Sequence, residues 1–326
     1  MNIIVTGAAG FVGSSLVDRL LSFNHSVIGI DNFSTGFNEF LINARQHKNF
    51  RLLNINLLDF DSLLPIFINI DAVFHMAANA DIRGGVANPK RDLEQNTLVT
   101  FNVLEAMRKS GTRRIIFSST AAALGEPIVF PTPEDCAIPN QTSFYGASKM
   151  ACEGLISSFC SSYGFEAYVF RFVSLLGPRY PHGHVFDFVK KLKLNPKKLE
   201  ILGDGLQRKS FIHIDDCISA MLLIGNDMRP FNSKSGGYSV YHLGSSSFCT
   251  IKQSAAWICK ELHLDPEFEF SGGERGWIGD SPFVFLDTTK VRALGWIPTI
   301  SIEDSVKITA RWLNENPWIL RLSPRV

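Results

Sequence analysis

The first thirteen residues place a glycine-rich turn between a buried strand and a helix. Residues 2–6 are short, apolar and β-branched, which suits a strand that is buried on both faces of a sheet. Gly7, Gly10 and Gly13 follow, and helical periodicity continues over residues 14–21. Such glycines permit a tight turn and let backbone N–H groups approach a pyrophosphate at a helix N-terminus. Their spacing departs from the simplest dinucleotide fingerprint, so the flanking strand and helix carry this interpretation.

An acidic residue ends the second predicted strand, which covers residues 26–30. Asp31 lies about 20 residues beyond the glycine turn, where a carboxylate accepts hydrogen bonds from an adenosine ribose and repels a 2′-phosphate. This position favours NAD over NADP as the cofactor. The alternative is that Asp31 only forms a turn before Asn32.

Strand and helix patterns alternate through the first half of the chain. Because this alternation is typical of βαβ units, it predicts the α/β class, with a doubly wound parallel sheet of the Rossmann type. An amphipathic helix is expected over residues 92–110, and a second helix carries Tyr145. The further strands are predicted at residues 51–55, 72–77, 114–117 and 166–172.

The regular alternation ends near residue 173. Later segments are shorter and richer in proline and glycine, although residues 238–243 again read as a strand. We therefore expect residues 1–173 to form an NAD-binding Rossmann domain whose sheet the strand at 238–243 completes. Residues 174–326 are expected to form mainly a smaller, mixed α/β lobe that binds substrate.

Tyr145 and Lys149 are four residues apart and therefore share one face of a helix. A phenol has a reference pKa of about 10, and a neighbouring ammonium or a cationic nicotinamide favours the phenolate form. Thr120 follows Ser118 and Ser119 at the end of a strand, so its hydroxyl is placed to reach the same substrate oxygen. The alternatives are an ordinary surface pair and hydroxyls that only cap a turn.

Composition excludes several classes of protein. The chain has 326 residues, 45% of them hydrophobic, and a net charge of +1, so nothing indicates a nucleic-acid partner. The basic run at 190–198 is typical of a solvated helix face. Six scattered cysteines form no Cys-x-x-Cys pair, so no metal site or disulfide framework is indicated, and a cytoplasmic location fits best. No signal peptide or membrane span is expected.

The motifs together resemble the extended short-chain dehydrogenases/reductases, and among them the NAD-dependent nucleotide-sugar epimerases and dehydratases. The 4-epimerases that act on UDP-glucose are the most similar group. The resemblance covers nearly the whole chain. Its motifs are found at residues 7–13, 31–36, 118–120, 145–149, 177–179, 202–205, 211–216 and 275–280.

This resemblance implies roles for individual residues. Tyr145 would be the base that takes the proton of the sugar 4-hydroxyl, Lys149 would lower its pKa and hold the nicotinamide ribose, and Thr120 would bind the 4-oxygen. The cofactor contacts implied are Gly7, Gly10, Phe11, Val12 and Gly13 at the pyrophosphate, Asp31, Asn32 and Ser34 at the adenosine ribose, Asn56 and Leu57 at adenine, and Ala77, Ala78, Asn79 and Asn96 along the channel.

The resemblance also implies substrate contacts, with some departures from the family pattern. Ser174 stands where asparagine is common, and Lys209 stands where arginine is frequent, which removes a bidentate contact with the diphosphate. Val284 stands where a tyrosine limits the room around the sugar 2-substituent, so we expect N-acetyl sugars to be accepted. The substrate contacts implied are Ser119, Thr120, Ser174, Val185 and Ile201 (the last two near the nucleotide base), Lys209 and Arg275 at the diphosphate, and Val284.

The implied reaction is reversible oxidation at sugar C4, followed by return of the hydride to the opposite face. The family's dehydratases and decarboxylases have an extra acid after the threonine, whereas this chain has Ala121 and Ala122 there. A 4-keto reductase remains an alternative, and so does a non-catalytic dinucleotide-binding sensor, although the intact Thr120, Tyr145 and Lys149 argue against a sensor. The resemblance further implies a UDP-linked sugar and a homodimer formed through the helices at 92–110 and 145–163.

Overall fold

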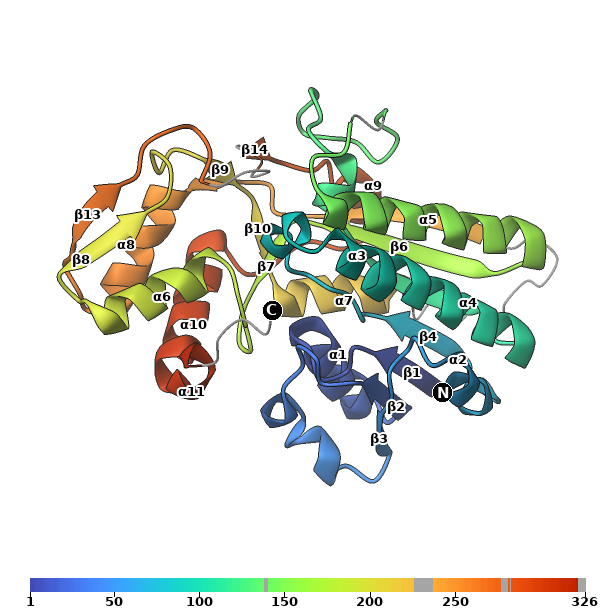
Figure 1. Cartoon of the computed structure of the whole chain (residues 1–326). Coiled ribbons are helices and arrows are strands. Elements are labelled where there is room, and N and C mark those ends of the chain that lie inside the picture. Colours follow the sequence, from blue (N-terminus) through green and yellow to red (C-terminus); the bar gives the residue numbers. More distant parts are fainter. Residues whose placement is uncertain (138–139, 226–236, 277–280, 282, 322–326) are drawn as a thin grey trace. The chain divides into compact units, whose positions relative to one another are not determined.

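The computed structural model describes residues 1–137, 140–225, 237–276, 281 and 283–321 (Figure 1). Internal contacts divide the chain into two compact units. Unit 1 comprises Met1–Glu126, Ala137–Arg171 and Ala220–Tyr241, and unit 2 comprises Pro127–Cys136, Phe172–Ser219 and His242–Val326. The domain boundary expected at residue 173 stays a prediction.

Unit 1 is built on a seven-stranded sheet with the strand order β3-β2-β1-β4-β5-β6-β11. The pairs β1–β2, β1–β4, β2–β3 and β4–β5 are all parallel. The predicted α/β fold with a doubly wound parallel sheet is confirmed. Its strands are β1 (Asn2–Thr6), β2 (Ser26–Asp31), β3 (Phe50–Asn54), β4 (Ala72–His75), β5 (Arg114–Thr120), β6 (Glu166–Phe172) and β11 (Gly237–Leu243).

Both faces of the sheet are covered, which explains why the central strands β1 and β4 are almost continuously apolar. Val73, Ile115 and Phe117 pack on one face in a core cluster that also contains residues of helices α4 (Val99–Ser110) and α5 (Phe144–Tyr163). On the other face, Gly225 at the end of helix α7 (Ile214–Gly225) lies against Ile116 and Phe74. Successive strand residues therefore enter two different cores, so an alternating polar pattern is absent from these strands.

The helices of unit 1 include a segment that the sequence pattern did not predict. The helix expected over 92–110 begins at Pro89, and its residues 93–98 form a π-helical segment, η5, that contains Asn96. Such segments are frequent at functional sites. The helices are α1 (Phe11–Ser22), α2 (Phe60–Leu63), α3 (Pro89–Asp92), η5 (Leu93–Leu98), α4 (Val99–Ser110) and α5 (Phe144–Tyr163), with 3₁₀ turns η1 (Asn38–Leu41), η2 (Ala44–Gln46), η3 (Leu64–Phe67), η4 (Arg83–Val86) and η6 (Ala121–Leu124).

The strand register places the carboxyl ends of several strands side by side. Thr6 of β1 lies opposite both Ile30 of β2 and His75 of β4. The residues that follow these strands are therefore neighbours at the carboxyl edge of the sheet, where open α/β sheets bind their ligands.

Unit 2 contains short strands and five helices that lie wholly within it, counted over the described residues. Strands β10 and β7 pair in parallel, β13 pairs with β8, and β9 lies between β12 and β14. Helix α7 (Ile214–Gly225) begins in unit 2 and ends in unit 1. The other elements are β7 (Ser174–Leu176), β8 (Lys198–Ile201), β9 (Arg208–Lys209), β10 (Phe211–His213), β12 (Cys249–Thr250), β13 (Glu267–Phe270), β14 (Phe283–Val284), α6 (His184–Leu194), α8 (Ile251–Glu261), α9 (Thr289–Arg292), α10 (Ile302–Glu315) and α11 (Pro317–Leu320).

Within the described ranges, no helix combines the length and the apolar character needed to cross a membrane.

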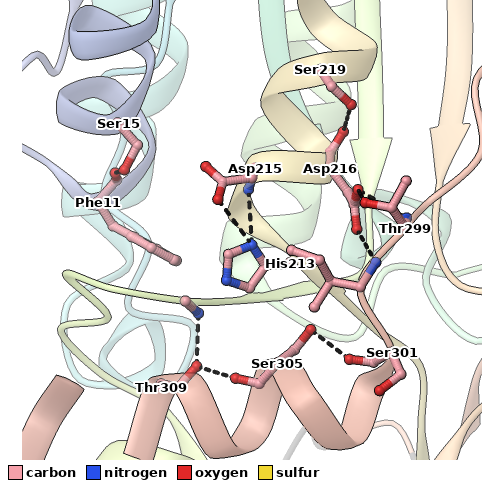
Figure 2. A network of polar contacts seen from close by, with 12 residues as sticks. Phe11, Ser15, His213, Asp215, Asp216, Ser219, Thr299, Ser301, Ser305 and Thr309 are labelled. Carbon is pink, nitrogen blue, oxygen red and sulfur yellow. Dashed lines mark hydrogen bonds and ion pairs between the residues drawn. The ribbon is translucent and has the colours of Figure 1, made fainter. Parts of the chain in front are cut away.

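A buried carboxylate in the first turn of α7 holds the segment that precedes α10 (Figure 2). Asp216 is 4% exposed, and its Oδ1 accepts hydrogen bonds from the backbone N–H of Thr299 at 3.0 Å and from the Thr299 hydroxyl at 2.9 Å. Its Oδ2 accepts from the backbone N–H of Ile300 at 3.0 Å. The Asp216 carbonyl also accepts from Trp296 Nε1 at 3.0 Å. One residue therefore satisfies four donors of this segment, three through its carboxylate and one through its backbone carbonyl.

We predict that Asp216→Ala lowers the free energy of unfolding by about 2 to 4 kcal/mol, because it leaves buried donors without an acceptor. The neighbouring Asp215→Ala is the control. Its side chain is 55% exposed and contacts His213, so its loss should change stability by less than about 1 kcal/mol. Urea denaturation followed by circular dichroism measures both. Equal losses in the two variants would show that Asp216 is not a specific anchor.

Candidate active site

The glycine turn leaves no space for a side chain at two of its positions. Gly7 has a φ of +65°, and a Cβ atom there would lie 2.7 Å from the backbone of Ala77. A Cβ atom on Gly13 would lie 2.0 Å from the Gly7 carbonyl oxygen. The N-terminus of α1 has neither a side-chain cap nor an acidic residue in its first turn. Its N–H groups and helix dipole can therefore receive a phosphate group.

Asp31 is held in a fixed orientation at the carboxyl end of β2. Its Oδ2 accepts a hydrogen bond from the Ala9 N–H, and its Oδ1 accepts one from the Phe33 N–H, both at 2.8 Å. Burial raises the pKa of this carboxyl, and the two backbone donors oppose that rise. The carboxylate thus ties the glycine turn to the loop that follows β2.

An open cavity lies along this edge of the sheet, within unit 1. Nine of the residues expected to contact the cofactor line it, namely Gly7, Gly10, Asp31, Asn32, Ser34, Asn56, Leu57, Ala77 and Ala78. The others in its wall were not predicted, although each lies within four residues of a strand end or of Asn96. They are Ile30, Thr35, Ile55, Met76, Gln95 and Val99.

Two predicted cofactor residues outside this lining belong to a buried polar network. The Asn79 N–H donates to Asn96 Oδ1 at 2.8 Å, and Asn96 Nδ2 donates to Ser148 Oγ at 2.8 Å. Asp92 Oδ1 accepts from Asn79 Nδ2 at 2.9 Å, and burial raises the pKa of Asp92. Sequence reasoning missed Asp92 and Ser148. The four-residue spacing of Asp92 and Asn96 was the available signal for the first.

The first turn of α5 approaches the residues after β5 closely. Ser143 caps the helix, accepting from the Gly146 N–H at 3.0 Å. A Cβ atom on Gly146 would lie 2.5 Å from the Ala122 carbonyl oxygen, so only glycine permits this approach. Tyr145 consequently hydrogen-bonds Thr120 and is 8% exposed. The structure therefore brings two of the three predicted catalytic residues into contact.

Lys149, the third, is buried one turn further along α5. Its Nζ donates to the Ser118 carbonyl at 2.8 Å and lies 4.6 Å from the centre of the Phe117 ring. Burial lowers the pKa of Lys149 to about 8, opposed by the charges of Cys152 and Glu153.

The pKa of Tyr145 differs from the sequence-based expectation. Burial raises it above the ordinary phenol value, and the proximity of Asp92 and Cys152 adds to the rise. The hydrogen bond from Thr120 opposes this rise without cancelling it. In the protein by itself, desolvation therefore determines the direction of the shift, and the phenol stays protonated at neutral pH.

The residues expected to contact substrate fall in both units. In unit 1, Ser119 Oγ donates to Glu153 Oε1 at 2.5 Å, and Ser119 is 1% exposed. In unit 2, Lys209 of β9 lies opposite Val284 of β14, and its Nζ donates to the Ser281 carbonyl. Their roles stay predictions, as do those of exposed Ser174 and Arg275 and of fully buried Val185 and Ile201. Residues 277–280 of the 275–280 motif lie outside the described residues.

The doubly wound sheet and its glycine turn define the dinucleotide-binding class of α/β proteins. Residues 3–240 match the NAD dependent epimerase/dehydratase family, and the chain belongs to that family. The resemblance to extended short-chain dehydrogenases/reductases, the assignment as an NAD-dependent epimerase and the choice of NAD as cofactor are thereby confirmed.

Individual relatives are similar along their whole length. The chain is 31% identical over 320 residues to a putative UDP-glucose 4-epimerase of Methanocaldococcus jannaschii, covering 96% of this chain and 99% of the relative. A UDP-glucose 4-epimerase structure from Thermotoga maritima, with UDP-glucose, is 32% identical with a TM-score of 0.85, covering 97% and 100% of the two chains. A UDP-N-acetylglucosamine 4-epimerase structure from Methanobrevibacter ruminantium is 29% identical with a TM-score of 0.84, covering 97% and 98%.

The residues of unit 1 fit NAD. The uncapped helix N-terminus suits the pyrophosphate, and the carboxylate of Asp31, which lines the cavity, suits a ribose diol. The same carboxylate would repel a ribose 2′-phosphate, so its chemistry fits NAD better than NADP.

We predict that Gly36→Ala weakens NAD binding by about tenfold or more, because the added Cβ atom would displace Asp31. That atom would lie 2.9 Å from Asp31 Oδ1 and 2.8 Å from the Ala9 Cβ. Isothermal titration of the stripped protein with NAD measures the effect. Gly154→Ala is the control, since nothing lies within 4 Å of a Cβ atom there. Unchanged affinity in Gly36→Ala would exclude Asp31 from the ribose site.

Proposed function

We propose that the protein interconverts nucleotide sugars that differ in configuration at C4, with Tyr145 as the group that removes and returns the hydroxyl proton. The observation that carries this proposal is the buried group formed by Thr120, Tyr145 and Lys149. Thr120 hydrogen-bonds Tyr145, and Lys149 lies one helical turn away, on the same face of the helix. All three lie at the carboxyl end of β5 or in the helix that follows it.

Proton transfer is the step that these side chains perform. Tyr145 accepts the proton of the 4-hydroxyl, and Thr120 holds the oxygen that loses it. The raised pKa of Tyr145 makes this transfer unfavourable unless further positive charge is close. Lys149 supplies one such charge when it is protonated. NAD, when bound, supplies the second charge on its nicotinamide ring and the capacity to accept and return a hydride.

The residues after Thr120 argue against elimination chemistry. A dehydratase or decarboxylase needs a further acid or base next to the oxidised sugar. Ala121 and Ala122 form the 3₁₀ turn η6 directly after Thr120, and neither side chain can transfer a proton. A cycle of oxidation and reduction at a single carbon requires no such group, and it regenerates the cofactor.

The substrate is proposed to be linked to UDP, since the similar enzymes named above act on UDP-sugars. We assign Val284 to the wall beside the sugar 2-substituent. What supports this is its position opposite Lys209, the residue proposed to bind the diphosphate. A valine leaves more room than a tyrosine, so an N-acetyl group should fit.

A homodimer through α4 and α5 belongs to the same proposal. Several large apolar side chains on η5, α4 and α5 are exposed in the single chain, and such exposure often marks an interface. They are Leu98, Phe101, Phe144 and Tyr163. Light scattering after size-exclusion chromatography tests it, and a monomeric mass would exclude it.

We predict that the purified protein, with no added cofactor, forms C4 epimers from at least one of UDP-glucose, UDP-N-acetylglucosamine and UDP-glucuronate, as seen by NMR. Tyr145→Phe should lower this turnover by about 10³-fold or more while NAD stays bound, because the proton acceptor is lost. Absence of an epimer even with NAD supplied would contradict the proposal. Oxidation of NADH by a 4-keto nucleotide sugar would then favour a reductase.

We predict that Val284→Tyr lowers kcat/KM for UDP-N-acetylglucosamine at least about tenfold relative to UDP-glucose, because the larger side chain would fill the space for the N-acetyl group. Rates for both substrates, measured side by side in both directions, give this ratio. An unchanged ratio would show that Val284 does not face the 2-substituent. Val284→Ile, with one added methylene group, is the matched control and should change the ratio far less.

A further inference from the structure

A buried ion pair lies beside the catalytic group and has no place in the proton transfer. The Glu153 carboxylate and the Arg171 guanidinium are 2.7 Å apart, with side chains 3% and 7% exposed. Both Nε and Nη2 of Arg171 donate to the carboxylate. The Ser119 hydroxyl donates to it at 2.5 Å and the Tyr238 hydroxyl at 3.4 Å. The carboxylate of one α5 residue thus binds three neighbouring strands, β5, β6 and β11.

The ion pair is connected to the proposed catalytic residues through Ser119. Ser119 lies between Ser118, whose carbonyl accepts the Lys149 hydrogen bond, and Thr120, which hydrogen-bonds Tyr145. Helix α5 therefore contacts three consecutive residues of β5 through three consecutive turns of its own. The contact through Glu153 holds the middle residue.

Stability alone is a poor explanation for the pair. Removing two charges from water costs several kcal/mol for each ion, and an apolar pair of similar size is often equally stable or more so. A bidentate arginine–carboxylate pair does, however, fix the relative orientation of the elements that carry it. The elements fixed here are the helix and the strand end that carry the proposed proton-transfer residues.

We propose that the Glu153–Arg171 pair is a positioning device for the reaction, which holds Ser119 so that Thr120, Tyr145 and Lys149 keep their mutual geometry. The inference rests on the proposed function, because turnover is one of its readouts. Glu153 and Arg171 do not touch the reacting atoms. They act through Ser119 and through the charge that Glu153 presents to Lys149.

The charges around Lys149 determine in which direction its pKa moves when Glu153 is replaced. From its own helix, Cys152 and Glu153 raise its pKa. From β4 it is faced by His75, which burial keeps neutral with a pKa of about 3, and from β5 by the Ser118 carbonyl. Loss of the Glu153 charge therefore lowers the pH at which Lys149 loses its proton. The positive charge of Arg171, which Glu153 no longer offsets, acts in the same direction.

Two variants test whether the pair positions the reacting groups, separately from any effect on folding. Ser119→Ala keeps the ion pair and removes the hydroxyl that joins it to β5, whereas Glu153→Met/Arg171→Met replaces the pair with apolar side chains of similar length. Both should unfold within a few degrees of the wild-type protein. Both should lose about 10- to 100-fold in kcat, with KM changed by less than about twofold, because the reacting groups are misplaced by a fraction of an ångström.

The same two strands offer a matched control. Glu166 at the start of β6 accepts from Arg114 at the start of β5 at 2.7 Å and from Tyr168 at 2.5 Å. Glu166→Gln therefore weakens a similar pair at the opposite end of the strands. Its kcat should stay within about twofold of wild type, whatever its stability.

A pH readout separates the charge effect from a structural one. In Glu153→Gln, the alkaline limb of kcat and the NMR titration of the Lys149 Cε should both shift to lower pH by about one unit. The Lys149 resonance, assigned with Lys149→Met, reports this shift without turnover. If the wild-type protein epimerises no nucleotide sugar, the proposed function fails while this titration still tests the pair.

The proposal is overturned if Ser119→Ala and the double variant fold with wild-type kcat and Glu153→Gln titrates as wild type. It is also overturned if Glu166→Gln loses as much kcat as Ser119→Ala, since the effect would then follow from any loss of polar contacts on these strands.

Discussion

The close approach of the glycine turn to the chain after β4 is the constraint on which the rest of unit 1 depends. A Cβ atom on Gly7 would overlap the backbone of Ala77, so β1 and β4 can end at one level only with glycine at that point. Buried hydrogen bonds of neighbouring strand residues stabilise this contact. Thr6 Oγ1 accepts from the Ala77 N–H and lies 2.7 Å from Nδ1 of His75, and His75 reaches Thr100 at 3.0 Å. The level of the strand ends is thus fixed by contacts in the interior of the sheet unit.

The site is built from charged and polar groups that have been removed from water. Asp31, Asp92, Lys149 and Glu153 are all less than a tenth exposed. Each has at least two hydrogen-bond partners or one partner and an aromatic face, as buried polar groups require. Because the partners of Lys149 and Glu153 lie on strands β5, β6 and β11, these hydrogen bonds also fix how α5 is seated on the sheet. The buried polar groups therefore orient these elements more than they add to the net free energy of folding.

The sequence predicted features whose cause is local, and it missed those that depend on distant residues. The glycine turn, Asp31 and the Tyr145–Lys149 spacing are each defined within a few residues, and nine of the expected cofactor contacts line one cavity. The π-helical segment at 93–98 could not be predicted, because tertiary contacts of Asn96 with Asn79 and Ser148 accompany it. The Glu153–Arg171 pair is likewise invisible in sequence, since a helix residue and a strand residue 18 positions apart meet only in the folded chain.

The opposed pKa shifts of Tyr145 and Lys149 show that the fold alone does not provide a phenolate base. Burial drives both groups toward their neutral forms, raising the pKa of the phenol and lowering that of the ammonium to about 8. A neutral phenol beside a lysine that is protonated at pH 7 is the resting arrangement, and it is a poor base. The same burial gives any added positive charge a large effect, because the local dielectric constant is low. Under the proposed function, such a buried pair would become active only with a cationic ring beside it, which would couple proton transfer to the presence of an oxidised cofactor.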